Sequence, residues 1–392
     1  MRGYENKYFS KRLILASQYF LYFGVMGAFL PYFNLYCYHL GFSGFQIGIL
    51  SSVRSITMIL CPLLWGILAD RFNVRKPIYI FCNILSSLIW IFFLFTSNFW
   101  LILIITLCHG FFYTPIISFL EAFTMDILGK AKKDYGHIRA WGSGSFVVTV
   151  LIFGWLIDLY SIEIILIFIL AGSLMQALIA LKIPSITIKK KPPASGKVVF
   201  VKGRVILFLF CGFLMLASHG TYYGFFSIHL TKSGFSNSFI GIAWGLASLS
   251  EIFIMVNSAR IFKNFSLESI LLFSFLTAFA RWLLLSFSAS ASVIILTQIL
   301  HAITYGTFHI ASILYIDSMS PEKNKTLGQA INNAATYGLG MMTGFLINGY
   351  LFDKIGAYSL FLLNSLISIT AFFLFWSFCK IPRKTMKDNL TV

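Results

Sequence analysis

Apolar runs of spanning length recur along the whole chain of 392 residues. A transmembrane α-helix needs about 20 mostly apolar residues, and a segment in lipid must satisfy its own backbone hydrogen bonds. Twelve runs meet this requirement, and the second and eleventh are the most amphipathic. The runs are residues 12–39, 46–69, 77–96, 98–128, 137–158, 161–183, 205–230, 238–259, 267–287, 291–316, 327–350 and 357–380. The sequence therefore predicts an all-α membrane protein with twelve transmembrane helices.

The composition agrees with a chain that lies mostly in lipid. Hydrophobic residues make up 58% of it and charged residues only 11%, whereas about a quarter of a soluble domain is charged. The first apolar run, from Leu13 to Leu40, is too long for the apolar core of a signal peptide. We therefore expect no cleavable leader and a multi-pass protein of the cell (inner) membrane.

The formal net charge of +17 could suggest nucleic acid as a partner, but its distribution excludes that reading. With a cytoplasmic N-terminus, the cytoplasmic ends and loops hold 25 Lys and Arg and the external loops hold two, Lys232 and Lys354. This asymmetry is the positive-inside rule. It predicts that both termini are cytoplasmic and that the partners are the lipid bilayer and a small-molecule solute. The other three arginines, Arg54, Arg139 and Arg281, fall inside apolar runs.

The cysteines and the other reactive side chains give no sign of catalysis. The six Cys residues lie within or at the ends of apolar runs, and none forms a Cys-x-x-Cys pair. Disulfides and a metal framework are therefore not expected. No pairing of a nucleophile with a base is evident either. We predict that the protein is not an enzyme and that it has neither a metal site nor a cofactor.

A polar segment near the middle divides the chain into two similar halves. "PSITIKKKPPASGKVVFVKGR", residues 184–204, has the composition of a flexible linker. "GFSGFQIGI" from Gly41 is repeated as "GFSNSFIGI" from Gly234, and "GWLID" before the linker is repeated as "GYLFD" after it. We predict an N-terminal six-helix bundle at 1–183, a cytoplasmic linker at 184–204, and a C-terminal six-helix bundle with a short tail at 205–392. Parallel repeats with a site between them describe one large class of transporters.

The loop after the second run carries the first resemblance to a known family. "GILADRFNVRK", residues 66–76, resembles the Gly-x-x-x-Asp-Arg-x-Gly-x-Arg-Lys loop of the major facilitator superfamily. The resemblance implies a conformational role for its matching residues, which are Gly66, Asp70, Arg71, Arg75 and Lys76. Asn73 replaces the usual Gly. Asn tolerates left-handed backbone angles better than most residues, so we expect the turn to be retained.

Further motifs narrow the resemblance within this superfamily. "YFLYFGVMGAFLPYF", "LEAF" and "YGHIRAWG" resemble the oligosaccharide:proton symporters of the lactose permease type. "YYGFFSIHL", "ARWLLL" and "QILHAITYGTFH" resemble transporters of the phenylpropionate and nucleoside permease types. The resemblance implies a monomeric secondary transporter that works by alternating access, with the proton as the coupling ion.

Glu121 and Arg139 are candidate substrate-binding residues in the first half. Each lies nine residues from Lys130, in the turn between the fourth and fifth runs. Equal distances from the turn place them at equal depth in an antiparallel hairpin, where the two charges could pair. The lactose permease resemblance implies that they bind sugar; the alternative is an interfacial acid and the last cytoplasmic cation. Phe146 takes the place of that family's sugar-stacking Trp.

Glu251, Arg281 and His301 form the corresponding set in the second half. Glu251 and Arg281 each lie fifteen residues from Ser266, and Arg281 and His301 each lie ten residues from Ala291. All three should therefore lie near the membrane centre, where ionisable groups are functional candidates. The resemblance implies roles in substrate binding for Arg281 and in proton transfer for Glu251 and His301. Thr304 replaces that family's proton-carrying Glu, so Glu251 with His301 must carry the proton if transport is proton-coupled.

Arg54 and Tyr222 complete the substrate-binding candidates. Arg54 lies about 12 Å into the second run, so the spans hold three Arg against the two acids Glu121 and Glu251. This surplus favours an anionic substrate, unless Arg54 only snorkels or pairs two helices. Tyr222, in the seventh run, could instead make an ordinary interhelical hydrogen bond.

Several functions stay open at this stage. The solute is an aromatic or other organic acid, an oligosaccharide or a nucleoside, and the direction could be import or export. A non-transporting membrane sensor or assembly protein on the same fold is the alternative class. Buried charges, which a scaffold does not need, favour the transporter.

Overall fold

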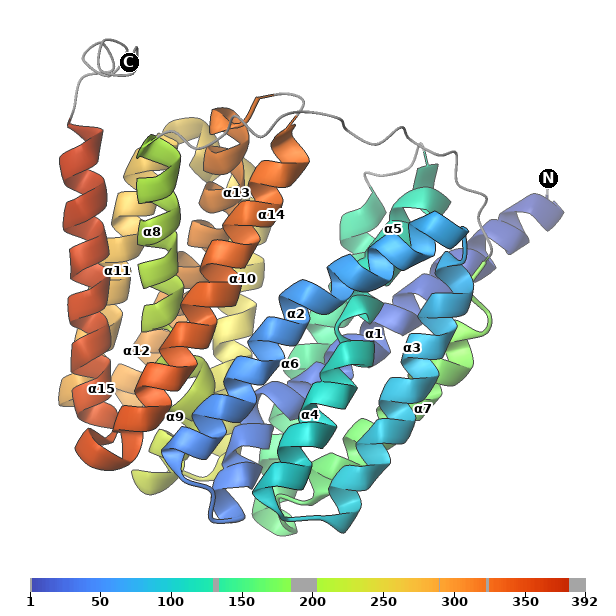
Figure 1. The fold of residues 1–392 in the computed structure, drawn as a ribbon, viewed down its shortest axis with the longest axis horizontal. Helices are drawn as coiled ribbons and strands as arrows, with labels where there is room; N and C mark the ends of the chain where they lie inside the picture. Colours follow the sequence, from blue (N-terminus) through green and yellow to red (C-terminus); the bar gives the residue numbers. More distant parts are fainter. Residues whose placement is uncertain (1, 130–133, 185–202, 289, 322–323, 381–392) are drawn as a thin grey trace. The chain divides into compact units, whose positions relative to one another are not determined.

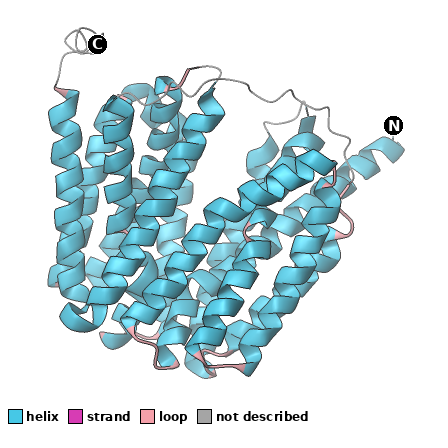
Figure 2. Ribbon diagram, in the orientation of Figure 1, coloured by secondary structure: helices cyan, strands magenta, loops and turns pink. Residues whose placement is uncertain are grey.

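A computed structural model describes residues 2–129, 134–184, 203–288, 290–321 and 324–380. These residues are helices joined by short turns and loops, with no strand among them (Figure 2). Most of the predicted linker at 184–204 and nearly all of the C-terminal tail lie outside the described residues, as do Lys130, Lys132 and Lys133.

The first part of the chain forms seven α-helices and one 3₁₀-helix. In order, they are α1 (Arg2–His39), α2 (Gly44–Phe72), α3 (Arg75–Trp90), η1 (Ile91–Phe95), α4 (Phe99–Tyr113), α5 (Pro115–Leu128), α6 (Tyr135–Leu159) and α7 (Ile164–Ala180). α4 and α5 are two parts of one span, from Phe99 to Leu128. They are interrupted at Pro115 because proline has no N–H to donate within a helix.

The second part follows the same scheme with two local departures from α-helical geometry. Its elements are α8 (Gly203–Ser218), α9 (Gly220–Lys232), α10 (Asn237–Asn264), α11 (Leu267–Phe287), α12 (Ala291–His301), η3 (Ala302–Thr307), α13 (Phe308–Met319), α14 (Lys325–Asn333), η5 (Ala334–Gly340) and α15 (Met341–Cys379). η3 and η5 are π-helical. Such segments occur frequently at functional sites.

The helices account for the twelve predicted spans. Ten described stretches are long and apolar enough to cross a membrane, and α7 is a shorter apolar helix. The longest stretch, Lys325–Cys379, has 55 residues and is broken at Gly356, where φ is 73°. Glycine adopts this backbone angle without steric cost, so α15 contains the end of one span and the whole of the next. The prediction of an all-α, multi-pass membrane protein is confirmed.

The chain packs as two compact units (Figure 1). The first unit consists of Met1–Pro192 with Tyr223–Ser248, and the second of Pro193–Tyr222 with Leu249–Val392. In the first, α1 packs against α6 and α7; in the second, α15 packs against α8 and α11. The division into six-helix halves at the linker stays a prediction.

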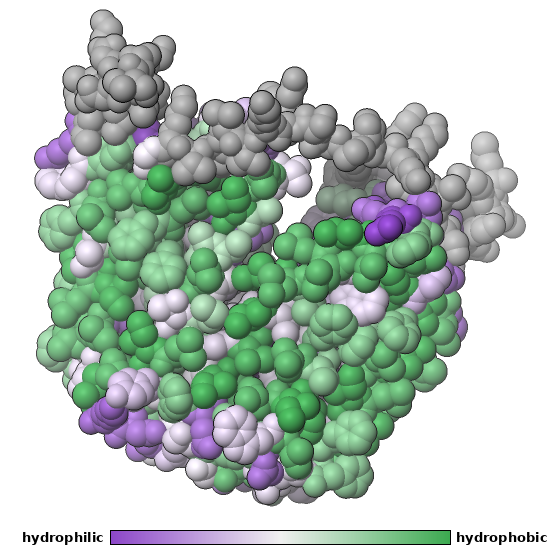
Figure 3. Space-filling view, in the orientation of Figure 1, coloured by the Kyte–Doolittle hydropathy of each residue, from purple (hydrophilic) through white to green (hydrophobic). Residues whose placement is uncertain are grey.

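The outer surface has the polarity that a lipid environment requires. Figure 3 shows apolar residues over most of the visible face, with hydrophilic residues gathered towards the helix ends. Large apolar side chains such as Phe95, Val256 and Phe287 are more than three-quarters exposed. Arg281, Gln298 and Asn332 are fully buried. Polar groups in the interior and apolar groups outside are the arrangement expected of helices in a bilayer.

Candidate functional site

The loop between α2 and α3 has the turn that its sequence predicts. Asn73 is left-handed, with φ 54° and ψ 40°, and this expectation is confirmed. The Arg75 side chain lies 2.7 Å from Asp70 Oδ1 and 3.6 Å from Asp126 Oδ2, at the end of α5. The loop is therefore tied to a second helix through Arg75. The conformational role of Gly66, Asp70, Arg71, Arg75 and Lys76 stays a prediction.

Arg54 projects from α2 towards α1. Its Nη2 donates to Asn34 Oδ1 and to Ser51 Oγ, each at 2.9 Å. The guanidinium carbon also lies 4.9 Å from the ring centre of Phe29 and 5.6 Å from that of Phe33. Among the described residues no carboxylate lies within 4.0 Å of it. Arg54 thus joins two helices while its charge is met by neutral groups and aromatic faces.

Asn34 holds Arg54 in place from the other side. Its amide nitrogen donates to Ser51 Oγ at 3.0 Å and to the carbonyl of Gly224 at 2.9 Å. The amide oxygen is therefore aimed at Arg54, because both N–H groups are used elsewhere. This arrangement fixes the position of a partly buried cation on the first unit.

Glu121 and Arg139 are near each other without forming the predicted ion pair. The Arg139 guanidinium carbon lies 3.8 Å from the ring centre of Phe23, on α1, in the geometry of a cation–π contact. The Glu121 carboxylate accepts a long hydrogen bond from the Tyr135 hydroxyl, at 3.5 Å. Within the described part of the chain, no salt bridge of 4.0 Å or less joins the two residues.

Glu121 and Phe146 are both accessible in the first unit. Glu121 lies on α5 with an exposed side chain, and Phe146 lies on α6, seven residues after Arg139, with a half-buried one. The two residues thus lie on the helices that come before and after residues 130–133, with Arg139 between them in the sequence. Their predicted role in substrate binding stays a prediction.

Glu251, His301 and Arg281 form a continuous chain of contacts in the second unit. His301 Nε2 lies 2.6 Å from Glu251 Oε1, and His301 Nδ1 lies 2.7 Å from Arg281 Nη1. Arg281 Nη1 also donates to Thr304 Oγ1 at 3.1 Å. The prediction from equal depth, that these three ionisable residues lie together, agrees with this geometry.

The direction of each hydrogen bond follows from the arginine. A guanidinium can only donate, so His301 Nδ1 must accept from Arg281. The imidazole proton is then on Nε2, and Nε2–H donates to the Glu251 carboxylate. His301 is a neutral relay in this arrangement, with a cation at one nitrogen and an acid at the other.

Tyr222 supports the same network from α9. Its ring centre lies 4.3 Å from the guanidinium carbon of Arg281, and the Trp282 ring lies 4.5 Å from that carbon. The Tyr222 hydroxyl donates to Gln298 Oε1 at 2.8 Å. Tyr222 therefore makes an interhelical hydrogen bond and also covers Arg281, whose side chain is fully buried.

The structure adds one linkage that the sequence analysis did not identify. The Asp158 carboxylate, in the last turn of α6, accepts hydrogen bonds from the backbone N–H groups of Asn237 and Ser238 at 2.8 Å each. Both residues lie at the start of α10, where backbone N–H groups lack partners within the helix. The "GWLID" motif that ends at Asp158 contained the signal. In the sequence this motif indicates a repeat but does not show which helix Asp158 contacts.

Fold and site together define a class of protein. Spans that bury ionisable side chains in each of two units are the expected features of a carrier for polar solutes. Residues 12–363 match the sequence model of the family described as "MFS_1 like family". The chain belongs to this family, and the predicted major facilitator fold, with twelve transmembrane helices, is confirmed.

Named relatives of the chain are transporters. It is 26% identical over 373 residues to an Escherichia coli protein described as "Probable 3-phenylpropionic acid transporter", covering 92% of this chain and 96% of the relative. It is 25% identical over 362 residues to the maltose permease of Geobacillus stearothermophilus, covering 90% and 91%. Relatives of this kind are permeases rather than enzymes, in agreement with the prediction.

Solved structures show the same fold. The crystal structure of the nucleoside transporter NupG superposes with a TM-score of 0.84 at 19% identity, covering 95% of this chain and 99% of that one. The POT family transporter PepTSo gives a TM-score of 0.76 at 11% identity, covering 94% of this chain and 97% of that one. The chain is thus a transporter by family and a major facilitator protein by fold.

Proposed function

We propose that this transporter is a proton-coupled symporter of a small organic solute, working by alternating access. The observation that carries the proposal is the contact chain from Arg281 through His301 to Glu251. It places an acid, a neutral imidazole and a cation in one interior network of the second unit. Glu251 is the proton carrier in this proposal, and Arg281 is a solute-binding residue of the same unit.

The network directs an incoming proton to Glu251. His301 cannot take a second proton at Nδ1 while Arg281 donates to that atom, because two donors would then face each other. The Glu251 carboxylate has free lone pairs and can become a neutral acid. Protonation would weaken its attraction to the His301 N–H and to the Arg281 charge, so that an anionic group of the solute could neutralise Arg281 in its place.

Binding of the solute is coupled to this step through Arg281. A solute group that accepts hydrogen bonds from Arg281 would compete with His301 Nδ1 and Thr304 Oγ1 for the same donor. The hydrogen bonds of His301 would then be rearranged, and the balance between charged and neutral Glu251 would change. Coupling between two ligands requires such a shared element.

The charges of the candidate residues favour an organic anion as the solute. Arg54, Arg139 and Arg281 exceed Glu121 and Glu251 by one positive charge, and Arg54 has only neutral polar partners among the described residues. Phe29 and Phe33 beside Arg54 offer aromatic surface. The name of the phenylpropionic acid transporter among the relatives supports an aromatic acid. Oligosaccharides and nucleosides are the other candidates.

The remaining parts of the proposal concern location and assembly. The 25-to-2 distribution of Lys and Arg supports a cytoplasmic location for both termini in the cell (inner) membrane. We propose that the protein acts as a monomer and that its only coupling ion is the proton.

The test is transport by Glu251→Gln in vesicles. This variant imitates the protonated acid, so it should exchange labelled solute between the two sides but fail to accumulate it against a gradient. Proton uptake during solute entry should be lost as well. Glu268→Gln, at the start of α11, is the matched control and should transport like the wild type. Accumulation by Glu251→Gln would overturn the proton assignment, and solute binding without exchange in the wild type would favour a sensor.

A further inference from the structure

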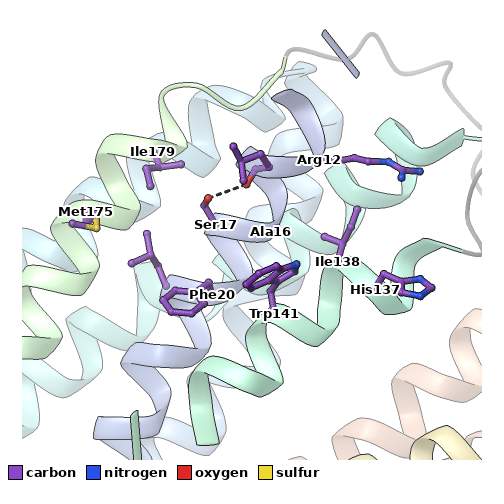
Figure 4. Close-up of a pocket in the computed structure, with 11 residues that line it drawn as sticks. Arg12, Ala16, Ser17, Phe20, His137, Ile138, Trp141, Met175 and Ile179 are labelled. Atoms are coloured by element: carbon purple, nitrogen blue, oxygen red, sulfur yellow. Dashed lines mark hydrogen bonds between the residues drawn. The ribbon is translucent and has the colours of Figure 1, made fainter. Parts of the chain in front are cut away.

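A groove on the outside of the first unit is built by α1, α6 and α7. Its volume is about 500 Å³, which is in the range of small-molecule sites. Figure 4 shows Ala16, Ser17 and Phe20 of α1 with Ile138 and Trp141 of α6 and Met175 and Ile179 of α7. It belongs to the surface of one unit, and none of the residues assigned to transport lines it.

The body of the groove is apolar and faces outwards. Leu13, Phe20, Trp141 and Met175 are 45–60% exposed on its walls. The one hydroxyl in it, that of Ser17, is occupied by a hydrogen bond to the carbonyl of Leu13, at 2.8 Å. A soluble polar ligand would therefore find few partners here, whereas a hydrocarbon chain would find a continuous apolar surface.

One end of the groove is polar and basic. Arg12 and His137 lie at that end (Figure 4), and Arg12 forms an ion pair with Asp134, just before α6. Lys182 lies one turn beyond Ile179, where its backbone N–H donates to the Ile179 carbonyl. Arg12, Lys182 and the neighbouring Lys11 outnumber Asp134, the acid that pairs with Arg12. The net charge is positive even with His137 neutral.

The basic end and the apolar body lie at the depths that a phospholipid would require. α1 and α6 begin at this end and α7 finishes at it, so all three place it on one side of the membrane, the side that the charge pattern predicts to be cytoplasmic. From Arg12 to Leu21 the groove descends about 14 Å along α1. Trp141 lies one turn below His137, and Trp is enriched at membrane interfaces.

We propose that this groove binds one anionic phospholipid, with its phosphate at Arg12, His137 and Lys182 and one acyl chain between Phe20, Trp141 and Met175. Basic pockets between transmembrane helices recognise anionic head groups in this way. The proposed occupant is structural and is distinct from the transported solute. Its position on α1 and α6 would make packing of these two helices sensitive to lipid composition.

The experiment measures contact between lipid and Trp141 directly. The full-length protein is placed in vesicles whose acyl chains carry bromine, a contact quencher of tryptophan fluorescence, on either phosphatidylglycerol or phosphatidylcholine. The contribution of Trp141 is the difference in fluorescence quenching between the wild type and Trp141→Phe. We expect it to be quenched preferentially by the anionic lipid, with a relative affinity about fivefold higher for each basic residue involved.

Three variants make the result specific. Lys182→Glu should abolish the preference for the anionic lipid, while Lys263→Glu, the same charge change at the end of α10, should preserve it. Ala16→Phe should fill the groove and reduce quenching by both lipids. Equal quenching of Trp141 by the two lipids in the wild type would overturn the proposal, because the groove would then hold only bulk lipid. Loss of the preference in Lys263→Glu would also overturn it.

Discussion

Asp158 and Ser238 are joined by two hydrogen bonds across 80 residues of sequence. The Ser238 backbone N–H and its hydroxyl both donate to Asp158 Oδ2, at 2.8 and 2.6 Å. The other carboxylate oxygen accepts from Asn237. Since α10 begins at Asn237, Asp158 acts as the N-cap of this helix although it belongs to α6. A cap supplied by another helix stabilises the start of the capped helix. It also holds the end of α6 against the start of α10.

Asp158→Ala should therefore destabilise the junction of α6 and α10. The variant loses four hydrogen bonds to one carboxylate, and the loss of a cap costs about 0.5–2 kcal/mol. We expect lower thermal stability in detergent and faster modification of a cysteine introduced at Asn237. Glu163→Ala removes an exposed acid from the following loop and should change neither measurement. Unchanged labelling in Asp158→Ala would show that the cap does not connect the two helices.

The backbone at Asn73 gives a second prediction. A φ of 54° is costly for residues with a Cβ, by about 1–2 kcal/mol, and Asn reduces that cost through local hydrogen bonding. Asn73→Gly should retain or slightly increase the unfolding free energy. Asn73→Val should lower it, because a β-branched side chain fits this region worst. Unfolding measured in detergent by chaotrope titration should give the highest stability for Asn73→Gly or the wild type and the lowest for Asn73→Val. Equal stabilities of the three proteins would contradict the argument.

Depth along the membrane could be predicted from the sequence, but rotation about a helix axis could not. Counting residues from a turn gives the depth of a side chain in an antiparallel hairpin, since each residue adds about 1.5 Å. This placed Glu251, Arg281 and His301 at one level, where they are in contact. The same count placed Glu121 and Arg139 at one level, yet Arg139 turns to the Phe23 ring on α1.

Contacts between segments that are far apart in the chain could not be predicted from the sequence either. The twelve apolar runs fixed the number of spans because lipid allows few alternatives to a helix. The apolar pattern carries no information about which helix meets which, so the contact of Asp158 with the start of α10 was not predicted. The π-helical segments η3 and η5 were not predicted either, because a single inserted residue hardly changes helical periodicity.

Thr304 provides a test of the network around Arg281. Its hydroxyl accepts from Arg281 Nη1 at 3.1 Å, and both side chains are fully buried. Thr304→Val keeps the shape but removes the acceptor, and a buried charged donor that loses a partner costs about 1–3 kcal/mol. We expect lower thermal stability and weaker accumulation of solute. Thr304→Ser keeps the hydroxyl and should behave like the wild type; if both variants behave alike, the hydrogen bond has no role.

Arg54 should give the transporter a higher affinity for anionic solutes than for neutral ones. Its guanidinium is fixed by Asn34 and Ser51 and has no carboxylate within 4.0 Å in the described chain. A solute carboxylate bound there would gain a charge-assisted hydrogen bond worth about 1.5–3 kcal/mol. Arg54→Gln should accordingly bind 3-phenylpropionate at least tenfold more weakly than the wild type. Binding is measured by the shift in melting temperature, with maltose and uridine as neutral probes.

The matched control is Arg54→Lys, which keeps the charge but cannot form two directed bonds in a fork. It should retain part of the affinity for the carboxylate, between the wild type and Arg54→Gln. Two outcomes would show that Arg54 does not bind the solute. In one, Arg54→Gln binds 3-phenylpropionate as tightly as the wild type does. In the other, only maltose or uridine stabilises the wild type, and that stabilisation is unchanged in Arg54→Gln. Arg54 would then serve to pair α1 with α2, as its hydrogen bond to Asn34 already does.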